Sequence, residues 1–155
     1  VYTAHSIPVE MARNCRYVEQ LRGTCRKISA ALGRADDPLV YQSRSGRPGQ
    51  PWLGPDILEY LRQTAAAAGS RQIVIAPVGF VSDHLEVIYD LDVEAKALCD
   101  ELNLSMTRAA TVGVHPAFVR MIRELVLERM SNDSAGRDPS GAQGELCDAD
   151  CCLPG

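Results

Sequence analysis

Four of the acidic side chains in the segment VGFVSDHLEVIYDLDVE (residues 78–94) are spaced so that they could act together. They are Asp83, Glu86, Asp90 and Glu94. At about 100° per residue on an α-helix, all four fall within roughly a quarter of the circumference, beside an apolar stripe. Carboxylates at this spacing repel one another by a few tenths of a kcal/mol, and no Lys or Arg lies among them on the arc. The repulsion between these carboxylates should therefore be compensated by a group that binds them, such as a cation or a proton.

Two kinds of chemistry would use such an acidic face. A row of oxygen ligands suits a hard or borderline divalent cation, and carboxylates crowded beside an apolar surface bind protons more readily than solvated ones. A merely solvated helix face is the ordinary alternative for a charged stripe. The successive like-charged pairs favour a path for metal ions, for protons, or for both.

Further candidate residues follow the ends of expected strands. His5 follows the first strand, Ser43 and Arg44 follow the second, and His84 follows the third together with the acids. Ligands bind beyond the carboxyl ends of parallel strands, so we expect these residues to meet in one crevice. Trp52, in the Pro- and Gly-rich loop after the second strand, either anchors that loop or forms a flat wall for a flat ligand.

Alternating strands and helices are expected to position these residues. We expect strands at VYTAHS, DPLVYQSR and RQIVIAPVGF, the last one buried on both faces, and a weaker strand near SMTRAAT. Helices are expected over residues 12–32, 55–68, 82–102 and 116–130. This alternation predicts an α/β fold, in which a parallel sheet carries helices on both faces.

The composition favours one globular domain and excludes several classes of partner. The chain has 155 residues, 46% hydrophobic and 23% charged, with a net charge of -4. Without a basic stripe, nucleic acid is not an expected partner, and no apolar run approaches the roughly 20 residues that cross a bilayer, so any membrane contact would be peripheral. No signal peptide is recognised, which predicts a cytoplasmic location. Because the chain opens on VYTAHSIP without a Met, we expect it to be a fragment.

The six cysteines form two groups. Three stand singly in expected helices and are predicted to be small buried core residues without disulfides: Cys15, Cys25 and Cys99. The other three crowd a Ser- and Gly-rich stretch, residues 132–155, that is predicted to be a flexible tail: Cys147, Cys151 and Cys152.

Three motifs together resemble the ferrochelatase family, whose members insert ferrous iron into a porphyrin in haem biosynthesis. They are YTAHSIP, YQSRSGRPGQPWLGP and APVGFVSDHLEVIYDLD, in this order and with these spacings. The resemblance implies that residues 1–131 are the second of two similar α/β lobes with the porphyrin cleft between them. It also implies that the first lobe is absent from this chain.

The resemblance assigns roles to individual residues. His5 and Glu86 would be catalytic, facing each other across the porphyrin and meeting its pyrrole protons or the incoming metal. Asp90 and Glu94 would complete the metal-binding set by conducting iron inward or protons outward. The substrate-binding set, taken from the motifs and from the ends of the strands, is Trp52, Ser43, Arg44, Asp83 and His84.

Several alternatives stay open at this point. Some family members carry a [2Fe-2S] cluster, for which Cys147, Cys151 and Cys152 are candidate ligands, and an unstructured tail is the alternative. The porphyrin is either protoporphyrin IX or coproporphyrin III. A small single-domain chelatase for cobalt or sirohydrochlorin, able to work as a homodimer, and a non-catalytic module that binds iron or porphyrin are the competing functions.

Overall fold

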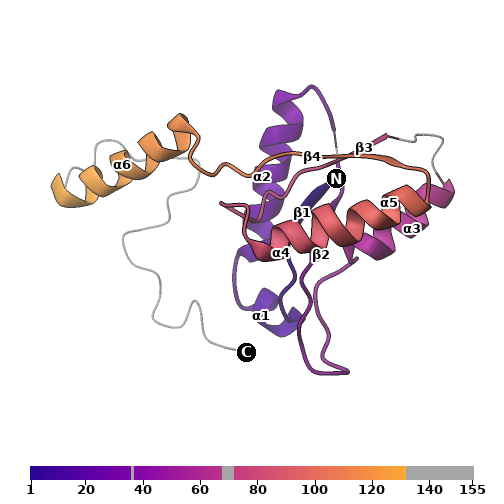
Figure 1. Cartoon of the computed structure of the whole chain (residues 1–155). Coiled ribbons are helices and arrows are strands. Elements are labelled where there is room, and N and C mark those ends of the chain that lie inside the picture. The colour runs from indigo at the N-terminus through magenta and orange to yellow at the C-terminus, as the bar shows by residue number, and fades with distance from the viewer. Residues whose placement is uncertain (36, 68–71, 132–155) are drawn as a thin grey trace.

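The computed structural model describes residues 1–35, 37–67 and 72–131, and strands alternate with helices along them (Figure 1). The elements are β1 (Tyr2–His5), α1 (Val9–Arg13), α2 (Tyr17–Ala31), β2 (Leu39–Gln42), α3 (Ile57–Ala67), β3 (Gln72–Ile75), α4 (Leu85–Val87), the π-helix η1 (Ile88–Ala95), α5 (Lys96–Glu101), β4 (Ser105–Arg108) and α6 (Pro116–Ser131). The α/β fold class is confirmed. The predicted tail, residues 132–155, lies outside the described residues.

The strands are parallel and bring their carboxyl ends to the same edge. β1 pairs with β2 from Tyr2 opposite Leu39 to His5 opposite Gln42, and β3 pairs with β4. A parallel bridge between Tyr2 and Ala76 joins the two pairs. The resulting order is β2, β1, β3, β4, so the first strand of the chain lies inside the sheet. Side chains that follow β1, β2 and β3 are thereby collected at one edge.

Helices cover both faces of the strands, as predicted. On one face Leu21 of α2 packs with Ala4 and Tyr41. On the other face α3 and the continuous run of α4, η1 and α5 enclose a larger core that includes Leu61, Ile75 and Leu91. Figure 1 shows α2 on one side of the strands and the α4 to α5 run, with α3 beside it, on the other.

The prediction that β3 is buried on both faces is wrong. Ile75 is fully buried, but Val74 is 56% exposed. Alternation along the strand points Ile73 and Ile75 into the core of α3 and α5 and points Gln72 and Val74 to the opposite face. On that opposite face α2 packs over β1 and β2. The half of the face formed by β3 and β4 therefore carries no described helix.

The expected helix over residues 12–32 is divided into α1 and α2. Pro8 lacks an N–H, which is not needed at the position before a helix. It therefore precedes α1, which begins at Val9, earlier than predicted. α1 ends at Arg13, and Asn14 N donates to Met11 O in the turn that follows. The break allows α2 to start at a new angle, from which the Tyr17 hydroxyl reaches back to the end of β1.

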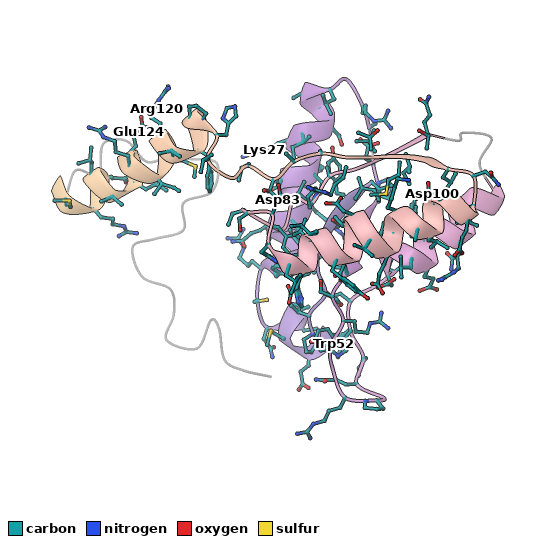
Figure 2. The ribbon with its side chains drawn as sticks, viewed as in Figure 1. Lys27, Trp52, Asp83, Asp100, Arg120 and Glu124 are labelled. Atoms are coloured by element: carbon teal, nitrogen blue, oxygen red, sulfur yellow. The ribbon has the colours of Figure 1, made fainter. Side chains whose placement is uncertain are left out.

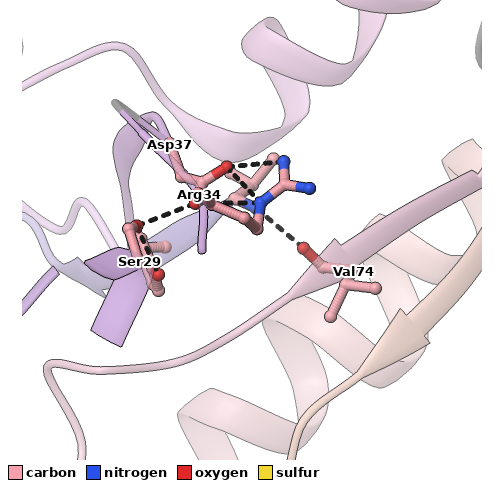
Figure 3. A network of polar contacts seen from close by, with 6 residues as sticks. Ser29, Arg34, Asp37 and Val74 are labelled. Atoms are coloured by element: carbon pink, nitrogen blue, oxygen red, sulfur yellow. Dashed lines mark hydrogen bonds and ion pairs between the residues drawn. The ribbon is translucent and has the colours of Figure 1, made fainter. Parts of the chain in front are cut away.

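A polar network fixes the end of α2 to the strands (Figure 3). Ser29 Oγ donates to Asp37 Oδ2 at 2.7 Å and lies 2.8 Å from the Tyr2 hydroxyl. The Arg34 guanidinium donates to both oxygens of Asp37. Hydrogen bonds from Arg34 and Ser29 lower the pKa of Asp37 to about 2. The carboxylate therefore stays charged and keeps the connection to β2 in place.

Helix α6 lies apart from the other elements, and Figure 2 shows its Arg120 and Glu124 away from the body of the fold. Much of its apolar surface is exposed, including Val119, Ile122, Leu125 and Val126. None of the described helices is long and apolar enough to cross a membrane.

Candidate functional site

His5, the last residue of β1, presents one ring nitrogen to the site. Its Nδ1 contacts the carbonyl oxygen of Ser6, which can only accept, so Nδ1 carries the hydrogen. The lone pair of a neutral ring is then on Nε2. The Tyr17 hydroxyl donates to the His5 carbonyl at 2.9 Å, and burial raises the pKa of Tyr17 to about 12, so it remains a donor. These two contacts, one at the His5 carbonyl and one at Nδ1, fix the orientation of the imidazole. Nε2 stays available to accept a proton or to bind a cation.

Glu86, in α4, faces that nitrogen. Its Oε2 lies 3.7 Å from His5 Nε2, longer than a hydrogen bond, and the two side chains are 54% and 32% exposed. Two basic atoms thus face each other at a distance that a shared proton or a cation could bridge. The predicted meeting of the residues after β1 and β3 is confirmed for this pair. The expectation that the two face each other across the porphyrin is wrong, because 3.7 Å is about one van der Waals contact and leaves no room for a ring between them.

The loop after β3 reaches β1 because Gly79 has no side chain. Gly79 N donates to Thr3 O at 3.1 Å, and a Cβ built on Gly79 would lie 2.5 Å from the Cβ of Ala4 and 2.7 Å from its Cα. Real Cβ atoms do not approach other atoms so closely. A glycine at this position therefore permits the approach that brings Glu86 toward His5.

Asp90 is held by the end of β2. Ser43 Oγ donates to Asp90 Oδ2, and Gln42 Nε2 donates to the same oxygen at 3.3 Å. Ser43 has a φ of 61°, a left-handed conformation that is uncommon outside glycine. Asp90 and Glu94 both line a pocket of about 180 Å³ at this edge. Arg44, which is exposed, lines it too.

The predicted regular α-helix over residues 82–102 is wrong in its first half. Leu85–Val87 form a short α-helix and Ile88–Ala95 form a π-helix, whose turns are wider because its hydrogen bonds run from i to i+5. Fully buried apolar residues recur here at every fourth position, namely Val87, Leu91, Ala95 and Cys99. This spacing of four residues is also common on amphipathic α-helices, and it keeps these residues on the buried face of the run from α4 to α5.

Asp83 does not belong to the acidic helix face. The helix begins at Leu85 with His84 in extended conformation before it, so Asp83 lies in the preceding loop. It accepts a hydrogen bond from Arg108 Nη1 at 2.9 Å. The predicted arc of four carboxylates is thereby corrected to three: Glu86, Asp90 and Glu94.

His84 and Trp52 are placed at the edges of the site. His84 is exposed, and its ring meets Phe80 edge to face with centroids 5.3 Å apart. Trp52 pairs with Pro8 through a backbone bridge, and a Cβ on Gly46 would overlap its indole. Figure 2 shows Trp52 beside the loop that follows β2. The structure thus gives Trp52 the role of a loop anchor, and its contact with a macrocycle stays a prediction.

The predicted metal ligands form two separate groups. His5 and Glu86 make one, and Asp90 and Glu94 share the pocket beside Ser43. Within residues 1–35, 37–67 and 72–131, no three His, Cys, Asp or Glu side chains gather closely enough to hold a metal ion.

Three cysteines among the described residues are free thiols: Cys15, Cys25 and Cys99. Cys25 and Cys99 are buried in helices as predicted, and burial raises the pKa of both. The prediction is wrong for Cys15, which lies half-buried in the turn between α1 and α2. The predicted cluster ligands lie outside the described residues: Cys147, Cys151 and Cys152.

Sequence reasoning missed Arg108, Tyr17 and Ser6. Arg108 ends β4, at the strand edge where ligand-binding residues gather, so the rule that selected His5 could also have found it. Ser6 donates its hydroxyl to Leu53 O at 2.8 Å and fixes the loop of Trp52 next to β1. No local sequence pattern indicates the contacts of Ser6 and Tyr17. Each hydroxyl donates to a backbone carbonyl that is distant in sequence, that of Leu53 for Ser6 and that of His5 for Tyr17.

A parallel α/β lobe with a histidine and carboxylates gathered at its strand ends defines a protein able to handle protons and a cation at one site. A sequence model of the family Ferrochelatase matches residues 1–130. The chain belongs to the ferrochelatase family, and the resemblance of its three motifs is confirmed.

Curated relatives support the same family. The chain is 49% identical over 155 residues to a ferrochelatase of Rhodopirellula baltica, covering 99% of this chain and 44% of that protein. It is 43% identical over 173 residues to the coproporphyrin III ferrochelatase of Streptomyces coelicolor, covering 97% of this chain and 46% of the relative. A coproporphyrin III ferrochelatase of Mycobacterium leprae is 39% identical over 162 residues. The chain spans about half the length of these relatives.

Proposed function

We propose that the protein containing this chain inserts Fe²⁺ into a porphyrin, and that His5 and Glu86 carry out the proton transfers. The observation that carries the proposal is the opposition of His5 Nε2 and Glu86 Oε2 at 3.7 Å. Membership of the family supports the reaction, and the geometry supports the choice of these two residues. The chain supplies one side of the site, as the second of two lobes.

The chemistry requires a base because a free-base porphyrin loses two N–H protons when it takes up a divalent ion. His5 Nε2 has a free lone pair that can accept a proton. Glu86 is the second acceptor, and it stabilises an imidazolium that forms beside it. Each of the two displaced protons therefore has a basic atom to receive it.

Asp90 and Glu94 would serve the supply of iron or the removal of protons. Carboxylate oxygens hold a hydrated divalent cation, and imidazole also suits Fe²⁺. Ser43 and Gln42 orient Asp90 from the neighbouring strand. An ion bound loosely in this pocket could pass along the helix toward Glu86 and His5. We therefore assign the delivery of iron to Asp90 and Glu94.

The names of two relatives favour coproporphyrin III over protoporphyrin IX as the substrate. Porphyrin contacts are part of the proposal for the whole predicted set: Trp52, Ser43, Arg44, Asp83 and His84. A [2Fe-2S] cluster on Cys147, Cys151 and Cys152, a homodimer and a cytoplasmic location stay predictions. Iron and sulfide analysis of the complete protein, purified without oxygen, tests the cluster.

The deciding experiment uses the complete protein without oxygen. Fe²⁺ is added with coproporphyrin III or with protoporphyrin IX, and the visible spectrum reports metalation. We expect one porphyrin to be metalated and Glu86→Gln, which keeps the shape and removes the charge, to lower kcat by about 10² or more. Porphyrin binding without metalation by the wild-type protein would favour the non-catalytic module. A Glu86→Gln variant that inserts iron at the wild-type rate would refute the role of Glu86.

A further inference from the structure

Arg108, the last residue of β4, holds two carboxylates with one guanidinium group. Its Nε and Nη2 donate to the two oxygens of Asp92 at 2.6 and 2.9 Å, and Nη1 donates to Asp83 Oδ1 at 2.9 Å. Nη1 also lies 3.3 Å from the carbonyl of Ala109, and only 17% of the side chain is exposed. A planar fork of donors can satisfy two carboxylates at once, which the single ammonium of a lysine does not reproduce.

The two carboxylates bracket the segment that carries Glu86. Asp83 lies in the loop before α4, and Asp92 lies in η1 after it. Glu86 itself is more than half exposed and contacts His5 across 3.7 Å, so its own contacts do little to fix it. The burial of Val87 and the two contacts of Arg108 hold the backbone on either side of it.

Arg108 also separates the acids of this segment into two sets. Asp83 and Asp92 are paired with its guanidinium. The other set makes no ion pair with a Lys or Arg among the residues that the structure describes: Glu86, Asp90 and Glu94. These three acids are the ones that face His5 or line the pocket beside Ser43. These three acids are thus not neutralised by an ion pair with a described Lys or Arg where a cation would pass, and Arg44 is the basic residue that lines the pocket with Asp90 and Glu94.

We propose that Arg108 is a positioning residue for metal insertion, which holds Glu86 opposite His5 by joining Asp83 to Asp92. This inference rests on the proposed function. A π-helix of this length is rare and depends on its surroundings, so the fork on Asp92 also maintains the wide turns of η1. Arg108 acts through Glu86 and does not itself touch the substrate.

The test compares two arginines that each bind a carboxylate through Nε and Nη2. Among the described carboxylates Arg34 binds Asp37 alone, away from His5, with bonds of 2.7 and 2.9 Å to Oδ1, so Arg34→Gln is the control for losing an arginine–carboxylate contact outside the site. In the complete protein, with Fe²⁺ and coproporphyrin III under anaerobic conditions, we expect Arg108→Gln and Arg108→Lys to lower kcat by about 10- to 100-fold, since a misplacement near 1 Å has an effect of this size. The KM for coproporphyrin III should stay within about twofold, because the porphyrin contacts remain. Arg34→Gln should lower the thermal midpoint and leave kcat unchanged.

A wild-type kcat in Arg108→Gln, with a lowered thermal midpoint as in Arg34→Gln, would show that Arg108 is only structural. If Arg108→Gln does not fold, Asp83→Asn removes a single contact from a carboxylate that is 38% exposed and should lower kcat in the same direction.

A crystal structure of Arg108→Gln provides a readout that does not depend on activity. We expect the 3.7 Å between His5 Nε2 and Glu86 Oε2 to increase, and an unchanged distance would overturn the proposal. If the wild-type protein metalates no porphyrin, the proposed function fails, whereas this distance still decides whether Arg108 positions Glu86.

Discussion

Replacing Gly79 by alanine should disturb both the fold and the site. The new Cβ would lie 2.5 Å from the Cβ of Ala4 and 2.7 Å from its Cα. Carbon atoms in contact are about 3.5–4.0 Å apart, so the loop has to retreat by roughly 1 Å. Ala4 is fully buried in β1, between β2 and β3, and cannot give way. The movement therefore falls on the loop that leads to Glu86.

The size of the effect follows from these contacts. Overpacking of this kind costs about 1–3 kcal/mol, and the bond from Gly79 N to Thr3 O, 3.1 Å long, contributes about 1 kcal/mol that is weakened or lost. A loss of about 2 kcal/mol lowers the thermal midpoint by roughly 4–8 °C in a protein of about 150–250 residues, and by less in the complete protein, which is about twice as long as this chain. A displacement of about 1 Å at Glu86 should also reduce the rate of metalation by about 10².

The matched control is Gly23→Ala in the middle of α2. The new Cβ would approach nothing closer than Arg26 Nη2 at 4.0 Å, and alanine in a helix interior is better than glycine by about 0.5–1 kcal/mol. The same substitution should therefore raise the midpoint slightly here and leave metalation unchanged. Differential scanning calorimetry and the anaerobic absorbance assay on the complete protein measure both effects. A Gly79→Ala variant that behaves like Gly23→Ala would refute the close approach of the loop to β1.

Two further substitutions test the site and the network at the end of α2. His5→Ala should abolish metalation while the thermal midpoint shifts by only a few degrees, because the ring is partly exposed and its hydrogen bond is to the adjacent Ser6 carbonyl. His115→Ala is the control. A collapse of the thermal transition in His5→Ala but not in the control would show that His5 is a core residue. Since the pKa of Asp37 is lowered to about 2, its interaction with Arg34 is fully present above pH 4 and is lost as the pH falls toward 2. The stability difference between wild type and Asp37→Asn should therefore shrink between pH 7 and pH 3, and a difference that is constant over this range would contradict the assignment.

The sequence was sufficient for the order of strands and helices and for the meeting of His5 with Glu86, because both follow from local periodicity and from the rule that parallel strands share an edge. The exposure of Val74 was not predictable, since it depends on how far α2 extends over the sheet. The π-helix was not predictable either, because the four-residue spacing of Val87, Leu91 and Ala95 is equally typical of an α-helix.

The pairing of Asp83 with Arg108 could not be read from the sequence. The two residues belong to different elements, and ion pairs of this kind are set by tertiary packing. An assumed α-helix from residue 82 onward placed Asp83 with the other acids, and only the start of α4 at Leu85 separates them. Element boundaries are the least certain part of such a prediction.

The position of β1 has a consequence for the order in which the chain folds. β1 is synthesised first, yet it must be enclosed by β2 on one side and by the chain near Ala76 on the other, both of which emerge later. Parallel pairings of this kind close long loops and are slow to form. His5 can meet Glu86 only after β1 has been inserted and the chain beyond β3 has folded back over it. Under the proposed function, iron insertion could thus begin only after these strands have paired.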